Sequence, residues 1–205
     1  LYPGVADQVF DLMSVWPFED NSIDYIHASH VLEHLPDPRK FFAEVWRVMT
    51  PEATMTLQLP YGGHTLAWCD LTHVRPWYPG TFCFLQPGYE ETVNNPQHGG
   101  WEYPFSVETH LRLSREACAL LQEKQKWMRV LVAKLFRHLQ DVCVELLVTV
   151  KPLKTKDTVE AYRQEIQGNL MRVAYCAYKH EWEGKPRPDG ETGEIVIVSG
   201  GDDHG

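Results

Sequence analysis

The stretch Asp24-Tyr25-Ile26-His27-Ala28-Ser29-His30-Val31-Leu32-Glu33-His34 decides how the rest of the chain is interpreted. Residues Ile23 to Ser29 have the length of a strand and little polar alternation, which is typical of a strand buried on both faces. Three side chains that can exchange protons or bind metal follow at once: His30, Glu33 and His34. In open α/β sheets ligands bind beyond the carboxyl ends of the strands, so we expect the functional site here.

The residues that follow complete a strand–helix–strand unit. Asp37 is a good N-cap and a proline suits the first helical position, so a helix is predicted over Pro38–Met49, and Pro51 ends it. Thr54–Leu59 alternates apolar and polar residues, which predicts a second strand. Two strands joined through a helix by short links indicate a right-handed parallel crossover.

The flanking segments extend this unit into a larger sheet. A short strand is predicted over Ala6–Leu12. Tyr61–Gly100 is rich in Gly, Pro and aromatic residues, and it is interpreted as a long ordered loop. Tyr103–Leu113 and Val142–Val150 are predicted to form a final pair of strands, with a helix from Ser114 to about Leu139 between them. The order of elements is that of an α/β fold.

The carboxyl-terminal quarter has a different character. Residues 1–152 are predicted to form the main domain, and residues 153–205 a C-terminal extension. Within the extension we expect an amphipathic helix over Thr155–Tyr178, broken near Gly168, and then either an edge strand or a tail at Glu194–Ser199. The last residues are expected to be a disordered tail.

Composition excludes several classes of function. The 205 residues include 28 acidic and 19 basic side chains, a net charge of −9, which disfavours nucleic acid as a partner. The five cysteines are scattered without a CxxC pair, which fits reduced thiols and predicts a cytoplasmic protein. No apolar run is long enough for a membrane span, so no membrane partner is expected.

Four motifs occur in a recognisable order along the first 60 residues. They are Asp11-Leu12, then Trp16-Pro17-Phe18-Glu19-Asp20-Asn21-Ser22-Ile23-Asp24-Tyr25-Ile26, then Ser29-His30-Val31-Leu32-Glu33-His34-Leu35, and then Glu44 with Arg47-Val48-Met49-Thr50-Pro51. In this order they resemble class I S-adenosylmethionine-dependent methyltransferases of the type 11 group. The resemblance covers roughly residues 6–60.

The resemblance implies a Rossmann-like methyltransferase sheet with its last strand antiparallel. It places Asp11, with Leu12, near the adenine of S-adenosylmethionine, where a carboxylate supplies an acceptor for the adenine amine. It places Ala28, Ser29 and His30 along the methionine side of the cofactor. The family's glycine-rich motif and its ribose-binding acid have no counterpart, so we interpret the sequence as a truncated one that lacks the first strands.

Two groups of residues are candidates for chemistry and substrate binding. The resemblance implies that His30 faces the transferred methyl group. Because an imidazole titrates near neutral pH, His30 is a candidate acid–base residue. The alternative is that His30 has a purely structural role. Asp70, His73 and Arg75 are predicted to bind substrate, with Asp70 orienting a catalytic His73 and Arg75 holding an anionic group. The alternative is an internal Asp70–Arg75 ion pair that folds the loop.

Metal chemistry is a further alternative. His30, Glu33 and His34 match the H-x-x-E-H pattern of one class of zinc peptidases, but that pattern requires a helix, and two prolines crowd the residues that follow. Some quinone-biosynthesis methyltransferases resemble this spacing with E-x-x-E-H and bind magnesium, which prefers oxygen ligands to an imidazole. We therefore predict no metal, and expect Glu33 and His34 to support the loop through hydrogen bonds.

The sequence as a whole predicts methyl transfer from S-adenosylmethionine to a small-molecule or glycan-like acceptor. The alternative is a non-catalytic, methyltransferase-like subunit that binds a ligand or dimerises, and a homodimer is left open. Metal-dependent hydrolysis ranks third.

Overall fold

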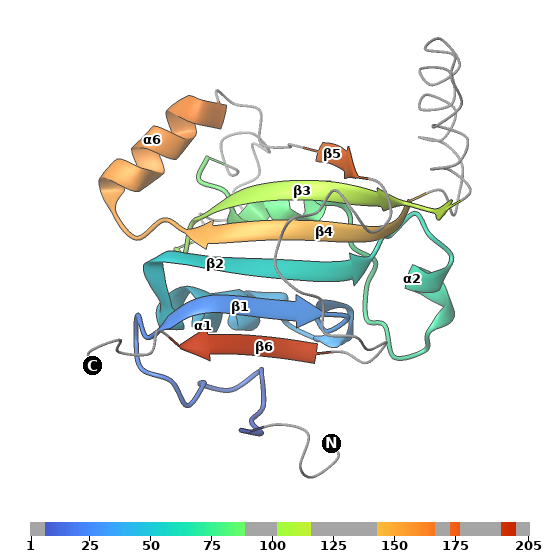
Figure 1. The fold of residues 1–205 in the computed structure, drawn as a ribbon, viewed down its shortest axis with the longest axis horizontal. Coiled ribbons are helices and arrows are strands. Elements are labelled where there is room, and N and C mark those ends of the chain that lie inside the picture. Colours follow the sequence, from blue (N-terminus) through green and yellow to red (C-terminus); the bar gives the residue numbers. More distant parts are fainter. Residues whose placement is uncertain (1–6, 89–101, 116–142, 167–172, 177–193, 200–205) are drawn as a thin grey trace.

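A six-stranded sheet, in the order β5-β3-β4-β2-β1-β6, forms the centre of the molecule (Figure 1). The computed structural model describes residues 7–88, 102–115, 143–166, 173–176 and 194–199. The strands are β1 (Ile23–Ser29), β2 (Met49–Pro60), β3 (Phe105–Leu113), β4 (Cys143–Pro152), β5 (Val173–Cys176) and β6 (Glu194–Ser199). The helices are η1 (Leu32–His34), α1 (Pro38–Val48), α2 (Leu66–Cys69), η2 (Pro79–Leu85) and α6 (Lys156–Ile166), of which η1 and η2 are 3₁₀.

The β1–α1–β2 unit confirms the predicted crossover. β1 and β2 pair in parallel, with Ile26 opposite Met55 and Ala28 opposite Leu57. Helix α1 begins after Asp37, whose side chain accepts a hydrogen bond from the backbone N–H of Arg39 at 3.1 Å. This cap satisfies one of the N–H groups that a helix start leaves without an intrahelical partner. The α/β fold class and the Rossmann-like sheet predicted from the sequence are confirmed.

The predicted final strand pair is confirmed as well. β3 pairs antiparallel with β4, and β4 pairs antiparallel with β2, so β4 joins the two halves of the sheet. The helix predicted over Ser114–Leu139 lies almost wholly outside the described residues. In the long loop after β2, the described part contains α2 and η2, and residues 89–101 are outside the description.

The strand predicted over Ala6–Leu12 is wrong over its described residues, 7–12, which form no strand. Asp11 instead closes a turn, because its carboxylate accepts hydrogen bonds from the Met13 backbone N–H at 2.9 Å and from the Ser14 hydroxyl at 3.1 Å. A strand also needs a ladder partner, and the outer edge of β1 is paired with β6. A short polar side chain that bonds nearby backbone favours the turn.

The carboxyl-terminal segments join the same sheet. The helix predicted over Thr155–Tyr178 is confirmed up to Ile166, but Val173–Cys176 forms β5, which runs parallel to β3 and takes one edge. Of the two alternatives left open for Glu194–Ser199, an edge strand or a tail, the structure shows the edge strand, β6, which is antiparallel to β1. The predicted break at Gly168 and the predicted disordered tail lie outside the described residues.

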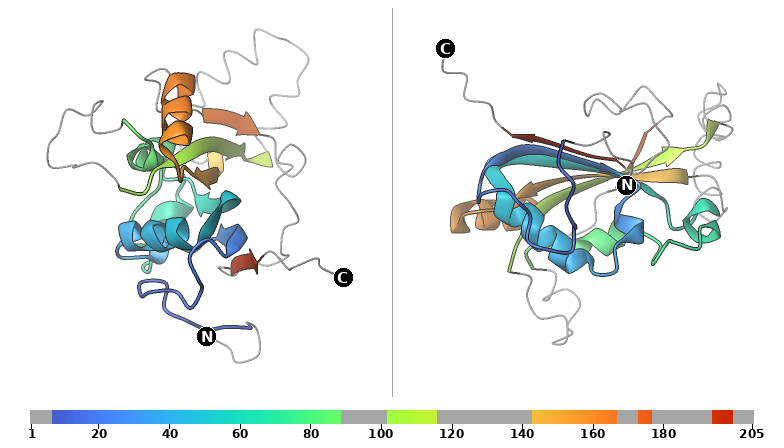
Figure 2. Two further views of the ribbon diagram at one scale, coloured as in Figure 1. Left: turned by 90° about the vertical axis from the view of Figure 1, so that its left-hand side faces the viewer. Right: turned by 90° about the horizontal axis from the view of Figure 1, so that it is seen from below.

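The main core lies between one face of the sheet and the helices that cover it. Figure 2 shows α1 and η2 on the same side of the strands. Phe42 of α1 is fully buried, with its ring centroid 6.3 Å from that of Phe82 in η2 and 6.0 Å from that of Phe105 in β3. Such edge-to-face contacts add to the free energy gained by burying the rings.

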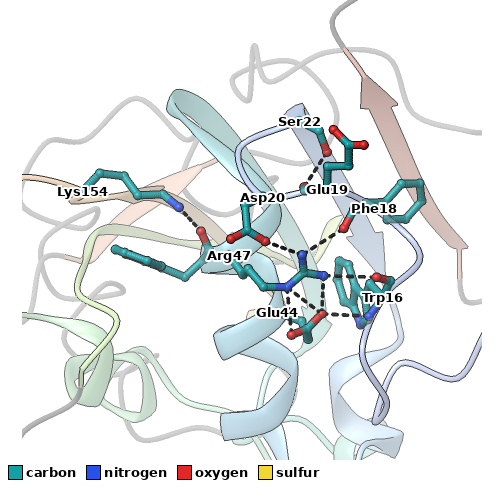
Figure 3. A network of polar contacts seen from close by, with 9 residues as sticks. Trp16, Phe18, Glu19, Asp20, Ser22, Glu44, Arg47 and Lys154 are labelled. Atoms are coloured by element: carbon teal, nitrogen blue, oxygen red, sulfur yellow. Dashed lines mark hydrogen bonds and ion pairs between the residues drawn. The ribbon is translucent and has the colours of Figure 1, made fainter.

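The segment before β1 is held on α1 by a network centred on Arg47 (Figure 3). The Arg47 guanidinium donates to the Glu44 carboxylate at 2.7 Å, to Asp20 Oδ1 at 2.7 Å and to the backbone carbonyls of Phe18 and Trp16. Glu44 also accepts from the Trp16 backbone N–H at 2.8 Å. The Glu44…Arg47 motif of the sequence therefore fixes the path of the chain into β1.

Candidate functional site

The site is built around His30, the residue at which the chain leaves β1. Its backbone is in the left-handed region, with φ of 52°, and its N–H donates to the carbonyl of Gln58 on β2 at 2.9 Å. A residue other than glycine in this conformation is uncommon, and such residues cluster at functional sites. The turn begins directly beyond Ala28 and Ser29, the last residues of β1, which are both buried.

The His30 imidazole lies between two carboxylates. Its Nδ1 is 3.3 Å from Glu33 Oε1, and its Nε2 is 3.5 Å from Glu145 Oε1. Hydrogen bonding to Glu145 and then to Glu33 raises the pKa of His30 to about 9, and partial burial works against this rise. His30 is therefore charged at neutral pH, and it can donate a hydrogen bond or a proton more readily than it can accept one.

Glu145, on β4, connects His30 to the interior of the sheet. Its carboxylate accepts a hydrogen bond from the Gln58 side-chain amide at 2.7 Å and forms an ion pair with the buried Arg112 of β3. Burial alone would raise the pKa of Glu145, but hydrogen bonding to His30 and Gln58 and the charge of Arg112 keep it below its usual value. The sequence analysis missed Gln58, Arg112 and Glu145, although Glu145 is a charged residue within the largely apolar strand β4.

The loop after α2 is folded by local hydrogen bonds and docks on η1. Asp70 accepts from the Thr72 backbone N–H at 2.8 Å and from the Thr72 hydroxyl at 2.7 Å. The backbone N–H of Val74 donates to the carbonyl of Glu33 at 2.7 Å. Arg75 Nη2 donates to the carbonyl of Pro36 at 2.7 Å, and among the described residues no ion pair joins Arg75 to Asp70. The loop therefore lies against the turn that carries His30.

A pocket of about 610 Å³ opens where this loop faces the ends of β1, β2 and β4. His30, Asp70, His73 and Glu145 supply its polar wall, and Leu66 and Leu71 contribute to its apolar wall. The structure thus brings together three of the predicted site residues, His30, Asp70 and His73. Asp11, Leu12, Ala28, Ser29 and Arg75 do not line this pocket.

A second cluster lies beside the pocket. Glu33, His34 and His73 each offer a ligand atom, and these atoms lie within 4.8 Å of one another. Glu33 is buried, His34 is exposed and His73 is half-buried. The sequence suggested a group of His30, Glu33 and His34. In the structure His30 lies between Glu33 and Glu145, and His73 of the loop joins Glu33 and His34.

Part of the chain is similar in sequence to known methyltransferases. Residues 4–57 match the family model described as "Methyltransferase domain". An uncharacterized methyltransferase of Mycobacteroides abscessus is 30% identical over 109 residues, which are 51% of this chain and 40% of that protein. Phosphoethanolamine N-methyltransferase 2 of Caenorhabditis elegans is 33% identical over 48 residues, 23% of this chain and 11% of that protein.

Among solved structures, a SAM-dependent methyltransferase from Archaeoglobus fulgidus superimposes with a TM-score of 0.46 and 16% identity, over 69% of this chain and 65% of that chain. The chain covers less than half the length of the curated relatives named here. The match of residues 4–57 to the methyltransferase domain family, with the similarity to methyltransferase relatives, confirms the resemblance to class I S-adenosylmethionine-dependent methyltransferases. The matched segment contains β1, α1 and most of β2.

None of the helices in the described part of the chain has the length and apolar character needed to cross a membrane.

Proposed function

We propose that this chain is part of an S-adenosylmethionine-dependent methyltransferase that acts on a small-molecule or glycan-like acceptor. The observation that carries the proposal is the match of residues 4–57 to the methyltransferase domain family. The same segment contains the parallel strand pair β1–β2, and His30 and Pro60, at the carboxyl ends of these two strands, line the pocket. That end of a parallel sheet is the usual place for a ligand.

The residues at the pocket fit a cationic methyl donor. S-adenosylmethionine, when bound, supplies a methyl group on a positively charged sulfur. Asp70 and Glu145 place two carboxylates at the pocket wall against one charged imidazole, that of His30, and no lysine or arginine of the described residues lines it. The volume of about 610 Å³ lies within the range of about 300–1,000 Å³ that is common for small-molecule sites. Contacts of the cofactor with Asp11, Leu12, Ala28 and Ser29 stay predictions.

His30 and His73 are the residues that we propose for proton handling. With its charge held by Glu145 and Glu33, His30 would donate a hydrogen bond to the acceptor and orient it. His73 has its Nδ1 engaged with the carbonyl of Ala67 at 3.1 Å, which leaves Nε2 to accept a proton. The proposed acceptor is a hydroxyl or amine, since the pocket wall is acidic and Arg75 is engaged with Pro36.

Binding of S-adenosylhomocysteine, measured by isothermal titration calorimetry, tests the proposal. We expect saturable binding, and transfer of labelled methyl from S-adenosylmethionine to a member of a panel of hydroxyl, amine and glycan acceptors. His73→Asn should lower the turnover number and leave S-adenosylhomocysteine affinity within about threefold. Absence of binding would overturn the proposal, and binding without transfer to any acceptor would support a ligand-binding subunit instead.

A cytoplasmic location is part of the same proposal. It is supported by the spacing of the five cysteines in the sequence, which are scattered without a CxxC pair.

A further inference from the structure

We propose that Glu33, His34 and His73 form a binding site for one divalent transition-metal ion of the zinc class, at the side of the pocket. The proposal rests on the position of these three side chains on two separate elements, η1 and the loop after α2. That loop is docked on η1 through the Val74 N–H and the Glu33 carbonyl, so the three residues are held together by the backbone.

Glu33 supplies a buried carboxylate with one oxygen that has no recorded polar contact among the described residues. Its side chain is 2% exposed and pairs with the charged imidazole of His30. Oε1 lies 3.3 Å from His30 Nδ1, and Oε2 has no recorded polar contact there. His30 compensates Oε1, but a buried carboxylate oxygen without a partner, such as Oε2, costs free energy unless a second cation or donor compensates it. A metal ion bound through Oε2 would supply that compensation.

Hydrogen bonds fix the His34 ring with one nitrogen available. The Thr72 hydroxyl donates its proton to Asp70 Oδ1, so its oxygen is left to accept one from a neighbour. His34 Nδ1 lies 3.0 Å from that oxygen and 3.3 Å from the Thr72 carbonyl, and both positions require Nδ1 to carry the proton. The neutral ring then has its lone pair on Nε2, which is the form that ligates a metal.

His73 is fixed in the same tautomer by a different partner. Its Nδ1 lies 3.1 Å from the carbonyl of Ala67, an acceptor, so Nδ1 again carries the proton and Nε2 carries the lone pair. A backbone carbonyl or a similar acceptor on the second ring nitrogen is the usual companion of a metal-bound histidine. The His34 and His73 rings are in edge-to-face contact, with their centroids 4.9 Å apart.

The donor set selects the kind of metal. Two imidazoles and one carboxylate suit zinc and its neighbours in the first transition row, whereas magnesium prefers oxygen ligands. Metal–ligand bonds of about 2.1 Å require ligand atoms about 3–3.5 Å apart, so the side chains must close from their present spacing of up to 4.8 Å. Asp70 Oδ2, 3.9 Å from His73 Nε2, could supply a further oxygen.

Three protein ligands leave a coordination position open, and His73 also lines the pocket. The open position would therefore receive an oxygen or nitrogen atom of a ligand in the pocket. A metal ion bound to His73 Nε2 would occupy the lone pair, so His73 would accept a proton only in the metal-free protein. The metal site itself does not depend on methyl transfer. It stands if S-adenosylhomocysteine fails to bind, and it can fail while methyl transfer succeeds.

Direct metal binding tests the site. The chelator-treated protein is titrated with Zn²⁺ in competition with a chromophoric chelator, and with Co²⁺ while visible absorption is recorded. We expect one equivalent of Zn²⁺ and a cobalt spectrum typical of mixed nitrogen and oxygen ligands. Glu33→Gln and His73→Gln should each weaken zinc affinity at least about tenfold. Thr72→Val should weaken it about tenfold through the orientation of His34.

His110→Ala is the matched control, because His110 is a partly exposed histidine on β3 whose recorded contact is Glu108. It should bind zinc as the unsubstituted protein does. Circular dichroism confirms that each variant is folded, and the cobalt spectrum of Thr72→Val reports the site even if its affinity changes little. Binding that is not saturable at one equivalent, or that is equal in Glu33→Gln, His73→Gln and His110→Ala, would overturn the proposal.

Discussion

At the scale of single residues, Lys154 shows how burial alters a charge. Its ammonium group donates a hydrogen bond to the carbonyl of Trp46 and lies 3.8 Å from the centroid of the Trp46 ring (Figure 3). Burial lowers the pKa of Lys154 from 10.5 to about 8, although the charge of Asp20 acts in the opposite direction. The contact with the ring does not restore the hydration that the charged form loses.

This shift predicts a pH dependence of stability. Between pH 8 and 10.5 Lys154 is protonated in the unfolded chain and largely neutral in the folded one, so the unfolded state binds more protons there. The free energy of unfolding should therefore rise with pH across this window, relative to Lys154→Met. Urea denaturation at several pH values measures the difference. If the difference in the free energy of unfolding between the unsubstituted protein and Lys154→Met stays constant or falls with pH, the lowered pKa of Lys154 is contradicted. Lys156→Met, at an exposed lysine, serves as the control.

At the scale of elements, α6 is attached to the sheet through a small cluster that includes Tyr162. The Tyr162 hydroxyl accepts hydrogen bonds from the Gln86 side chain at 2.5 Å and from the Val107 backbone N–H at 3.1 Å. Its ring packs with Cys83, Leu153 and Ile166 in a second hydrophobic cluster. One side chain of α6 thus contacts both η2 and β3, which are far apart in the sequence.

Removing only the hydroxyl should loosen α6. Tyr162→Phe keeps the ring but leaves a buried backbone N–H and a buried amide without their acceptor, which costs about 1–3 kcal/mol of the free energy of unfolding. We expect a lower urea midpoint and faster hydrogen exchange of the α6 amides. Gln164→Ala, on the exposed face of the same helix, should change the free energy by less than about 0.5 kcal/mol. Equal exchange rates in the two variants would contradict this role of Tyr162.

At the scale of the whole molecule, a line of polar groups crosses the sheet from the end of β1 to β3. It runs from His30 to Glu145 on β4 and on to Arg112, with Gln58 of β2 bonded to the same carboxylate. Four strands therefore meet at one carboxylate. A buried charge of this kind depends on its partners, because losing one of them leaves the other without compensation.

Arg112→Met should accordingly lower the free energy of unfolding by about 3 kcal/mol. Replacing the carboxylate as well, in Arg112→Met with Glu145→Gln, should recover part of that loss, since the remaining neutral amide needs no cation. The double-mutant cycle is expected to show coupling of about 0.5–3 kcal/mol. Thermal and urea unfolding of the four proteins measure it. Additive effects would show that the two groups act independently.

Much of the sheet and part of the site follow from the sequence alone. The spacing of apolar residues within residues 23–59, and the capping and proline residues at the ends of the elements, are local properties of the sequence. They predicted a strand, a helix and a second strand where β1, α1 and β2 lie, because capping and burial act within a few residues. The same signals found β3 and β4. The polar residues directly after β1 could be recognised because a strand end in a parallel sheet faces the ligand side.

Tertiary structure decided the rest. A short segment such as residues 7–12 becomes a strand only if an edge is available, and the edge of β1 pairs with β6, about 170 residues later in the chain. The contact between His30 and Glu145 could not be predicted from the sequence either. The two residues are far apart in the chain, and the order of the strands in the sheet brings them together. The sequence by itself therefore determined the elements and their apolar faces. Only the fold decided which charges meet, since long-range pairing is not encoded in local spacing.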